Sequence, residues 1–205
     1  MNSYTTILKS SIFEYEDRRS VFIAEAMPVS SEAEALDFIS SVKKKYSDAN
    51  HHVYAYVLRE NSIMRFSDDR EPQGTAGMPT LDAIRKNGIT DAAVVVVRYF
   101  GGTLLGTGGL VRAYGTAAVG ALKEAEIITY DTYVSFEIEF SYSDYQKCTS
   151  VIENSGFRCK GTEYSDTVKV TGTVRKPDAE VFVKTLSDLA SGRAKIKNLG
   201  EKYEF

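Results

Sequence analysis

The hydrophobic and polar positions in the first part of the chain follow two periods, one typical of strands and one typical of helices. Residues 18–29 predict a strand, and residues 30–46 predict a helix that begins with the capping box of Ser31 and Glu34. The run at 91–100 is apolar without alternation, so it predicts a central strand covered on both faces. The other elements expected here are strands at 51–60 and 62–67 joined by a turn at Glu60-Asn61, a helix at 75–88 closed by Gly88, and a helix at 110–125.

A second series of elements starts near residue 131. Residues 133–142 alternate cleanly between apolar and polar side chains and predict a strand. The elements expected after it are a helix at 143–156 capped by Ser143, a hairpin of strands at 157–165 and 167–175, a helix at 176–192, and a closing strand from Ala194. This β-α-β-β-α-β order is that of a ferredoxin-like fold. With a short linker at 129–132, the sequence predicts two α+β domains, 1–130 and 131–205.

The composition narrows the class of protein. The chain has 205 residues and a net charge of −3, and residues 1–130 and 131–205 carry −2 and −1, so neither part is a basic module. Because phosphate neutralisation supplies much of the affinity for nucleic acids, any such role must rest on a local patch. No run approaches the roughly 18 apolar residues of a membrane helix. The absence of a secretion signal, and a spacing of Cys148 and Cys159 that fits no metal or redox motif, favour a cytoplasmic protein.

A glycine-rich loop follows the apolar run, in the stretch VVVVRYFGGTLLGTGGLVRAYG. It is not a Walker loop, because Thr107-Gly108 stands where Lys-Ser is needed, and it is not a dinucleotide loop, because Val111 takes the place of the third glycine. A glycine-rich turn before a helix still presents N–H groups that suit an anion. Two interpretations stay open, namely tight packing of the helix on the sheet and a surface for a ligand or partner.

An acidic loop precedes it, in FSDDREPQGTAGMP. Asp68, Asp69 and Glu71 either close turns and cap the next helix or, with His51 or His52, bind a divalent metal or act as acid and base. Adjacent residues of a strand point to opposite faces, so only one of the two histidines is expected to face this loop.

Arg98 and Arg112 flank the glycine-rich loop, with Tyr99, Phe100 and Tyr114 beside them. Arginines among aromatic rings are typical of a surface that stacks bases and contacts phosphates. The alternative is an internal ion pair of arginine with Asp68 or Asp69.

The two loops together resemble the IMPACT/YigZ family. Its N-terminal domain carries S-D-D-G-E-P-x-G-T-A-G, matched here by SDDREPQGTAG, and R-Y-F-G-G-x-x-L-G-x-G-G-L-x-R-A-Y, matched by RYFGGTLLGTGGLVRAY. The family's H-x-x-x-A-Y element fits at His51 with Ala55 or His52 with Tyr56. The match covers about residues 18–125 and indicates a bacterial YigZ-type member.

The resemblance implies an N-terminal domain of the ribosomal protein S5 domain 2-like fold. It also implies a C-terminal domain similar to one of elongation factor G, in agreement with the ferredoxin-like order above. It further implies a translation-linked role, because eukaryotic relatives regulate a translational stress response through protein contacts. For bacterial members, ribosome or nucleic-acid binding is inferred from the fold.

Arg70 departs from the family motif, which has glycine at this position. If that glycine adopts a positive φ, Arg70 strains the turn by about 1 kcal/mol. If the turn differs here, Arg70 instead adds a positive charge to the acidic loop.

The leading hypothesis is a non-enzymatic, translation-associated regulator that binds RNA, the ribosome or a translation factor, without a cofactor, a metal or a membrane. The alternatives are a metal-dependent hydrolase or phosphotransferase that uses Asp68, Asp69, Glu71 and His52, and an adaptor that binds only proteins. The sequence leaves the oligomeric state open. The binding surface is expected to contain Ser67, Asp68, Asp69, Glu71, Gly74, Thr75, Gly77, Arg98, Tyr99, Phe100, Gly101, Gly102, Gly106, Gly108, Gly109, Arg112 and Tyr114.

Overall fold

The computed structural model describes residues 3–205, which form two compact units. The N-terminal unit comprises Tyr4–Thr129, and the C-terminal unit comprises Tyr130–Phe205 together with Ser3. The division falls next to the boundary expected from the sequence. The two-domain α+β class is confirmed.

The N-terminal unit is built on a five-stranded sheet whose neighbouring strands are antiparallel. In spatial order its strands are β2 (Ser11–Asp17), β3 (Ser20–Pro28), β6 (Ala92–Tyr99), β4 (His51–Leu58) and β5 (Ile63–Ser67). The central strand, β6, is buried from Ala92 to Arg98, as its apolar run predicts.

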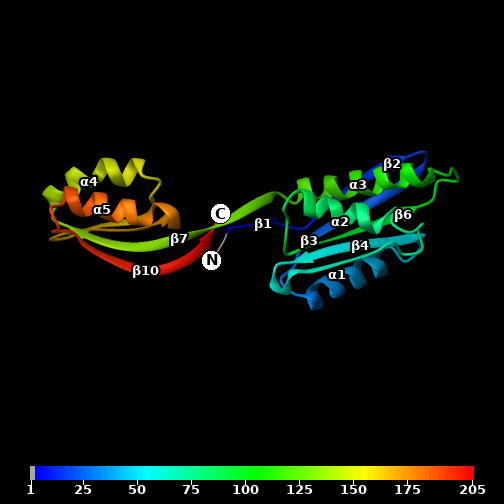
Figure 1. The fold of residues 1–205 in the computed structure, drawn as a ribbon, viewed down its shortest axis with the longest axis horizontal. Helices are drawn as coiled ribbons and strands as arrows, with labels where there is room; N and C mark the ends of the chain where they lie inside the picture. The colour runs from blue at the N-terminus through cyan, green and yellow to red at the C-terminus, as the bar shows by residue number, and fades with distance from the viewer. Residues whose placement is uncertain (1–2) are drawn as a thin grey trace. The chain divides into compact units, whose positions relative to one another are not determined.

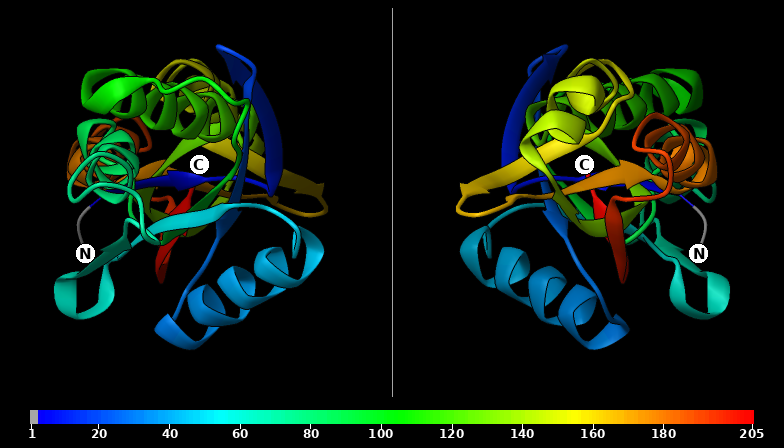
Figure 2. Two further views of the ribbon diagram at one scale, coloured as in Figure 1. Left: turned by 90° about the vertical axis from the view of Figure 1, so that its right-hand side faces the viewer. Right: turned by 90° about the vertical axis from the view of Figure 1, so that its left-hand side faces the viewer.

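Helices cover both faces of this sheet (Figures 1 and 2). On one face lie α2 (Gly77–Lys86) and α3 (Gly106–Glu124), whose buried side chains pack with Phe22, Val94 and Val96 of the sheet. On the other face lies α1 (Glu32–Lys45), which packs on Val95 and Val97. Adjacent residues of β6 therefore enter two different cores.

Several predicted details need correction in this unit. Strands β1 (Tyr4–Ile7) and β2 occupy a segment where the sequence predicted nothing, and β1 pairs with β7 (Ile127–Phe140). A 3-10 helix at Glu60–Ser62 replaces the simple turn between β4 and β5. Helix α3 begins at Gly106 and not at residue 110, because the second glycine pair is helical.

The C-terminal unit has the strand order β10-β7-β9-β8, with antiparallel neighbours, and this confirms the ferredoxin-like prediction. The elements that complete it are α4 (Tyr142–Asn154), β8 (Arg158–Tyr164), β9 (Val168–Arg175), a 3-10 helix at Lys176–Asp178, α5 (Ala179–Leu189) and β10 (Lys195–Glu204). The predicted cap of α4 was wrong, because Ser141 accepts the Asp144 N–H bond and Ser143 lies inside the helix. The core includes Phe136, Ile138 and Leu186.

One end of the N-terminal sheet collects the loops that carry the candidate residues. At this end Val21 pairs with Tyr99 and His51 pairs with Arg98, while α2 and α3 start just beyond β5 and β6. We call this region the loop end and define it as residues 17–20, 67–77 and 99–109. Within residues 3–205, no helix has the length and apolarity needed to cross a bilayer.

Candidate functional site

The carboxylate of Asp68 caps helix α2. Its Oδ1 accepts hydrogen bonds from the N–H groups of Ala76 (3.1 Å) and Gly77 (2.7 Å), and its Oδ2 accepts one from Gly74 (2.9 Å). The first N–H groups of a helix have no intrahelical partner, so these bonds stabilise the start of α2. The capping interpretation therefore fits Asp68.

Two hydroxyl groups close turns in the same loop. The Ser67 hydroxyl oxygen accepts from the Asp69 N–H at 3.2 Å, and the Thr75 hydroxyl donates to the Pro72 carbonyl at 2.7 Å. Thr75 is buried. Both residues therefore shape the loop from within.

Both histidines contact the acidic loop, whereas the sequence predicted that only one would. The Asp69 carboxylate accepts the backbone N–H of His52 at 2.6 Å, and the Asp69 carbonyl lies 2.9 Å from Nδ1 of His51. Nε2 of His51 lies 3.7 Å from Oε1 of Glu71, and Nε2 of His52 lies 2.8 Å from the Tyr46 carbonyl. The expectation fails because the Asp69 carboxylate accepts from the His52 backbone and also lies 3.8 Å from Nδ1 of His52, while Glu71 faces His51.

Glu71 joins the acidic loop to β6 and α3. Its Oε1 accepts from Nη1 of Arg98 and from the hydroxyl of Tyr114, each at 2.7 Å. Arg98 is 5% exposed, Glu71 8% and Tyr114 0%. Burial, and after it the charge of Glu71, raises the pKa of Tyr114 above its usual range, so the hydroxyl remains a donor.

Arg98 is therefore an internal group. The ion-pair interpretation holds, but its partner is Glu71 and not Asp68 or Asp69. Nη2 of Arg98 also donates to the Ser20 hydroxyl at 3.3 Å, while Nε has no hydrogen-bond partner among residues 3–205. A phosphate contact by Arg98, or base stacking by the buried Tyr114, does not fit this arrangement.

No group of three or more His, Cys, Asp and Glu side chains within the described part of the chain is arranged to hold a metal ion. The hydrolase hypothesis requires Asp68, Asp69, Glu71 and His52 to act together. Each of the three carboxylates instead accepts hydrogen bonds from donors of the protein itself.

The glycines have different structural reasons. A Cβ at Gly101 would overlap the backbone of Arg19, and one at Gly77 would lie 2.8 Å from the Ser67 carbonyl, so these two allow parts of the same chain to approach closely. Gly102 and Gly106 have φ angles of +80° and +70°, and their missing Cβ positions point into open space.

The remaining candidate glycines lie around the start of the two helices. Gly74 has a φ of +77° and faces open space. A Cβ at Gly108 would be 3.8 Å from Nη1 of Arg112, and one at Gly109 would be 3.0 Å from Cβ of Leu105. Packing therefore explains part of the glycine-rich loop and leaves the stretch from Gly102 to Gly108 open.

Three exposed arginines lie in the loop end, and a fourth, Arg112, lies just beyond it in α3. Arg18, Arg19, Arg70 and Arg112, which we call the arginine rim, are all exposed, and none of them forms an ion pair with any residue from 3 to 205. Arg19 is tied to the loop through its backbone contact with Gly101.

Two apolar side chains of the loop end are also exposed. Phe100 is 46% and Leu104 81% exposed, whereas the Tyr99 hydroxyl donates to Asp48 at 2.8 Å. The Phe100 N–H is held by the Asn50 side chain at 2.8 Å. No side chain of the described residues caps α3, and its first turn contains no acidic residue. Sequence reasoning did not identify Arg18 and Arg19, although their position before a strand was visible.

Arg70 has a φ of +71°, so it occupies the left-handed conformation that suits glycine. The first of the two interpretations of this position therefore holds. Its Nη2 also lies 3.5 Å from the Asn50 carbonyl.

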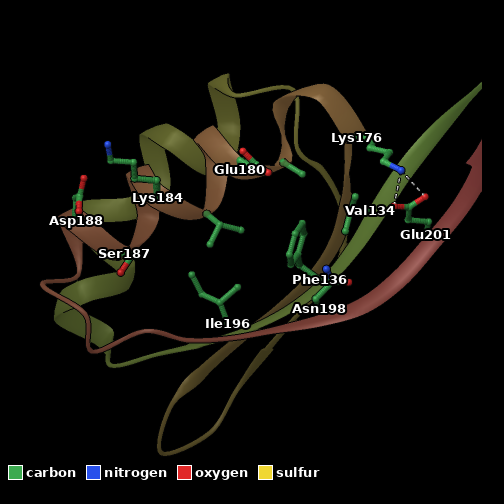
Figure 3. Close-up of a pocket in the computed structure, with 12 residues that line it drawn as sticks. Val134, Phe136, Lys176, Glu180, Lys184, Ser187, Asp188, Ile196, Asn198 and Glu201 are labelled. Carbon is green, nitrogen blue, oxygen red and sulfur yellow. Dashed lines mark hydrogen bonds and ion pairs between the residues drawn. The ribbon is translucent and has the colours of Figure 1, made fainter. Parts of the chain in front are cut away.

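A hollow of about 680 Å³ lies in the C-terminal unit between α5 and the strands β7 and β10. Figure 3 shows Phe136 and Ile196 facing the helix, with Lys176 bonded to Glu201 at one end. Lysines and acidic residues alternate around its rim, so charge does not select a class of ligand. The sequence reasoning placed no candidate here.

Comparison with known proteins matches both units. Residues 18–122 match the Impact N-terminal domain, and residues 138–193 match a domain of unknown function, DUF1949. The "IMPACT family member YvyE" of Bacillus subtilis is 34% identical over 96% of this chain and 91% of that protein. An "IMPACT family member" of Haemophilus influenzae is 32% identical over 97% of this chain and 98% of that protein. A crystal structure of a hypothetical protein is 28% identical with a TM-score of 0.60 and covers 98% of both chains.

Proposed function

Since the chain belongs to the IMPACT family, we propose that it is a translation-linked regulator that binds RNA through the loop end of its N-terminal unit. The family membership supports the link to translation only in general terms. The charge distribution of the loop end supports the choice of RNA.

The observation that carries the proposal is the separation of charges at the loop end. The carboxylates of Asp68, Asp69 and Glu71 are directed at internal donors. The arginine rim, in contrast, consists of four exposed arginines that form no ion pair among the described residues. A protein with a net charge of −3 thus presents a local cationic surface.

The roles of the residues follow from their exposure. Arg18, Arg19, Arg70 and Arg112 contact phosphates, for which the planar guanidinium group is well suited. Phe100 supplies a ring on which a base stacks. The uncapped N–H groups at the start of α3 add anion donors, and the open glycines from Gly102 to Gly108 allow a sugar-phosphate backbone to approach.

Salt dependence of binding tests this proposal. The affinity of the full chain for a single-stranded RNA 12-mer and for an RNA hairpin is measured by fluorescence anisotropy at several salt concentrations. For the single-stranded RNA, the triple variant Arg18→Ala/Arg19→Ala/Arg70→Ala should make the negative slope of log K against log salt shallower by about 2. Each phosphate contact to a single strand contributes about 0.7 to the steepness of this slope.

A matched control removes charge elsewhere in the same unit. The variant Arg85→Ala/Lys86→Ala changes the last turn of α2, away from the loop end, and should leave the slope unchanged. RNA binding that is absent from the wild type, or equally weakened in both variants, would refute the proposal and favour the protein-only adaptor.

A further inference from the structure

A groove of about 620 Å³ is lined by residues of α3 and by Phe13 of β2. Figure 1 shows these two elements side by side. Its apolar floor is formed by Val111 and Val119 of the helix and Phe13 of the strand. Val111 is 41% exposed, although it lies in a helix whose opposite side is fully packed. The groove therefore offers an apolar surface that the described chain leaves uncovered.

Two glycines lie inside α3 along this groove, and packing within the protein requires glycine at only one of them. A Cβ at Gly120 would overlap the ring of Phe13, so glycine is needed there for packing. A Cβ at Gly115 would point into open space, and its φ is outside the left-handed region. Because alanine is much the better helix former, the fold alone would be more stable with alanine at 115. Gly115 keeps the middle of the groove level with the helix backbone.

Each end of the groove has one cationic side chain. Arg112 lies at one end and Lys123 at the other, and neither forms an ion pair with a residue from 3 to 205. From Arg112 to Lys123 the helix rises about 17 Å, which corresponds to about three helical turns. Glu124 is the one acidic side chain that lines the groove in the described structure.

We propose that this groove binds an α-helix of a partner protein, whose apolar stripe is flanked by acidic residues at both ends. A helix fits the straight floor, and its backbone approaches closest at Gly115, where no side chain intervenes. Its acidic flanks meet Arg112 and Lys123. An RNA strand fits less well, since the cations lie only at the ends and the floor between them is apolar. This groove is separate from the surface that we propose to bind RNA, except for Arg112, which borders both surfaces.

Two synthetic helical peptides test the proposal on the full chain. Both are stapled 15-mers with the same leucine stripe, one with glutamates and one with lysines at its flanks, and binding is followed by amide shifts in NMR spectra of the labelled protein. The glutamate peptide should shift amides from Val111 to Gly120 with a Kd below 1 mM. The lysine peptide should bind at least tenfold more weakly.

Substitutions at Gly115 separate binding from folding. Gly115→Ala should raise the Tm by about 3 °C and weaken the glutamate peptide severalfold, so stability and affinity move in opposite directions. Gly115→Leu should abolish peptide binding and leave RNA binding unchanged, whereas Arg18→Ala/Arg19→Ala should do the reverse.

Three results would each overturn the proposal. They are no binding of the glutamate peptide at 1 mM, shifts confined to other regions such as the hollow of the C-terminal unit, and equal binding to Gly115→Leu and the wild type. Shifts of the same amides by the RNA 12-mer instead of the peptide would assign the groove to nucleic acid.

Discussion

Removing the charge of Glu71 should destabilise the N-terminal unit strongly. The side chains of Glu71 and Arg98 are 4% and 6% exposed, and Nη1 of Arg98 lies 2.7 Å from Oε1 of Glu71. In Glu71→Gln the guanidinium group stays buried without its counter-charge. Breaking a buried pair by removing one partner typically costs about 3–5 kcal/mol, because the remaining charge is neither solvated nor compensated.

Tyr114→Phe separates the hydrogen bond from the ion pair. The ring keeps its edge-on contact with Phe22, at 5.1 Å between centroids, and loses only the bond from its hydroxyl to Glu71. A hydrogen bond to a charged group contributes about 1.5–3 kcal/mol. Both substitutions act on the same carboxylate oxygen, so the double variant should lose less than the sum, by about 1 kcal/mol.

Native-state hydrogen exchange read by mass spectrometry is the suitable assay, because a global unfolding signal would mix the two units. The free energy of opening is taken from amides of β6, and amides of β9 serve as the control in the other unit. A loss below 1 kcal/mol in β6 of Glu71→Gln, or an equal loss in β9, would refute the reasoning.

Three further outcomes are expected. Asp68→Ala should lower the free energy of unfolding of the N-terminal unit by about 1–2 kcal/mol in the same exchange assay, because the cap of α2 is lost. Arg70→Gly should raise that free energy by about 1 kcal/mol, because glycine adopts the φ of +71° without the steric cost that a side chain has there. RNA affinity should fall in the same variant, because one arginine of the rim is lost. Hydrogen bonds from Arg193, and after them from Ser141, lower the pKa of Asp144 to about 2. A carboxyl group whose pKa is lowered in the folded state stabilises that state fully above its unfolded pKa, near 3.9, and this stabilisation is lost as the pH falls to about 2. In Asp144→Asn, the free energy of unfolding of the C-terminal unit, read from β9 amides, should therefore fall less steeply between about pH 4 and pH 2.

The strong periodic segments were readable from the sequence because burial dictates their composition. The valine run of β6 is apolar throughout because α1 covers one face of the sheet and α2 and α3 cover the other. Strand β2 was not predicted, because it is only half-buried and its composition shows no clear pattern. It is an edge strand in which Phe13 and Tyr15 turn inward between exposed glutamates, while the adjacent Ile12 is 55% exposed and hides the alternation.

The pairing inside the site was not readable, because it depends on a local turn. Asp69 and Arg70 both have positive φ angles, of 40° and 71°. The spacing of residues in the sequence does not predict this turn, so it does not predict where the side chains around it point. The carboxylates before and within this turn meet helix and strand N–H groups, while Glu71, just after it, meets Arg98. Three acidic residues within four positions thus have three different partners.

The two motifs that carry the family resemblance form one structural unit. Glu71 of the first motif bonds Arg98 and Tyr114 of the second, which fixes the acidic loop against β6 and α3. Part of each motif is therefore explained by folding and says nothing of a ligand. The positions that folding does not explain are Gly108 and the exposed Arg112, and they lie together in the first two turns of α3. If the motifs also serve recognition, substitutions of the bonded set must change stability and binding together, whereas substitution of the exposed Arg112 must change binding alone.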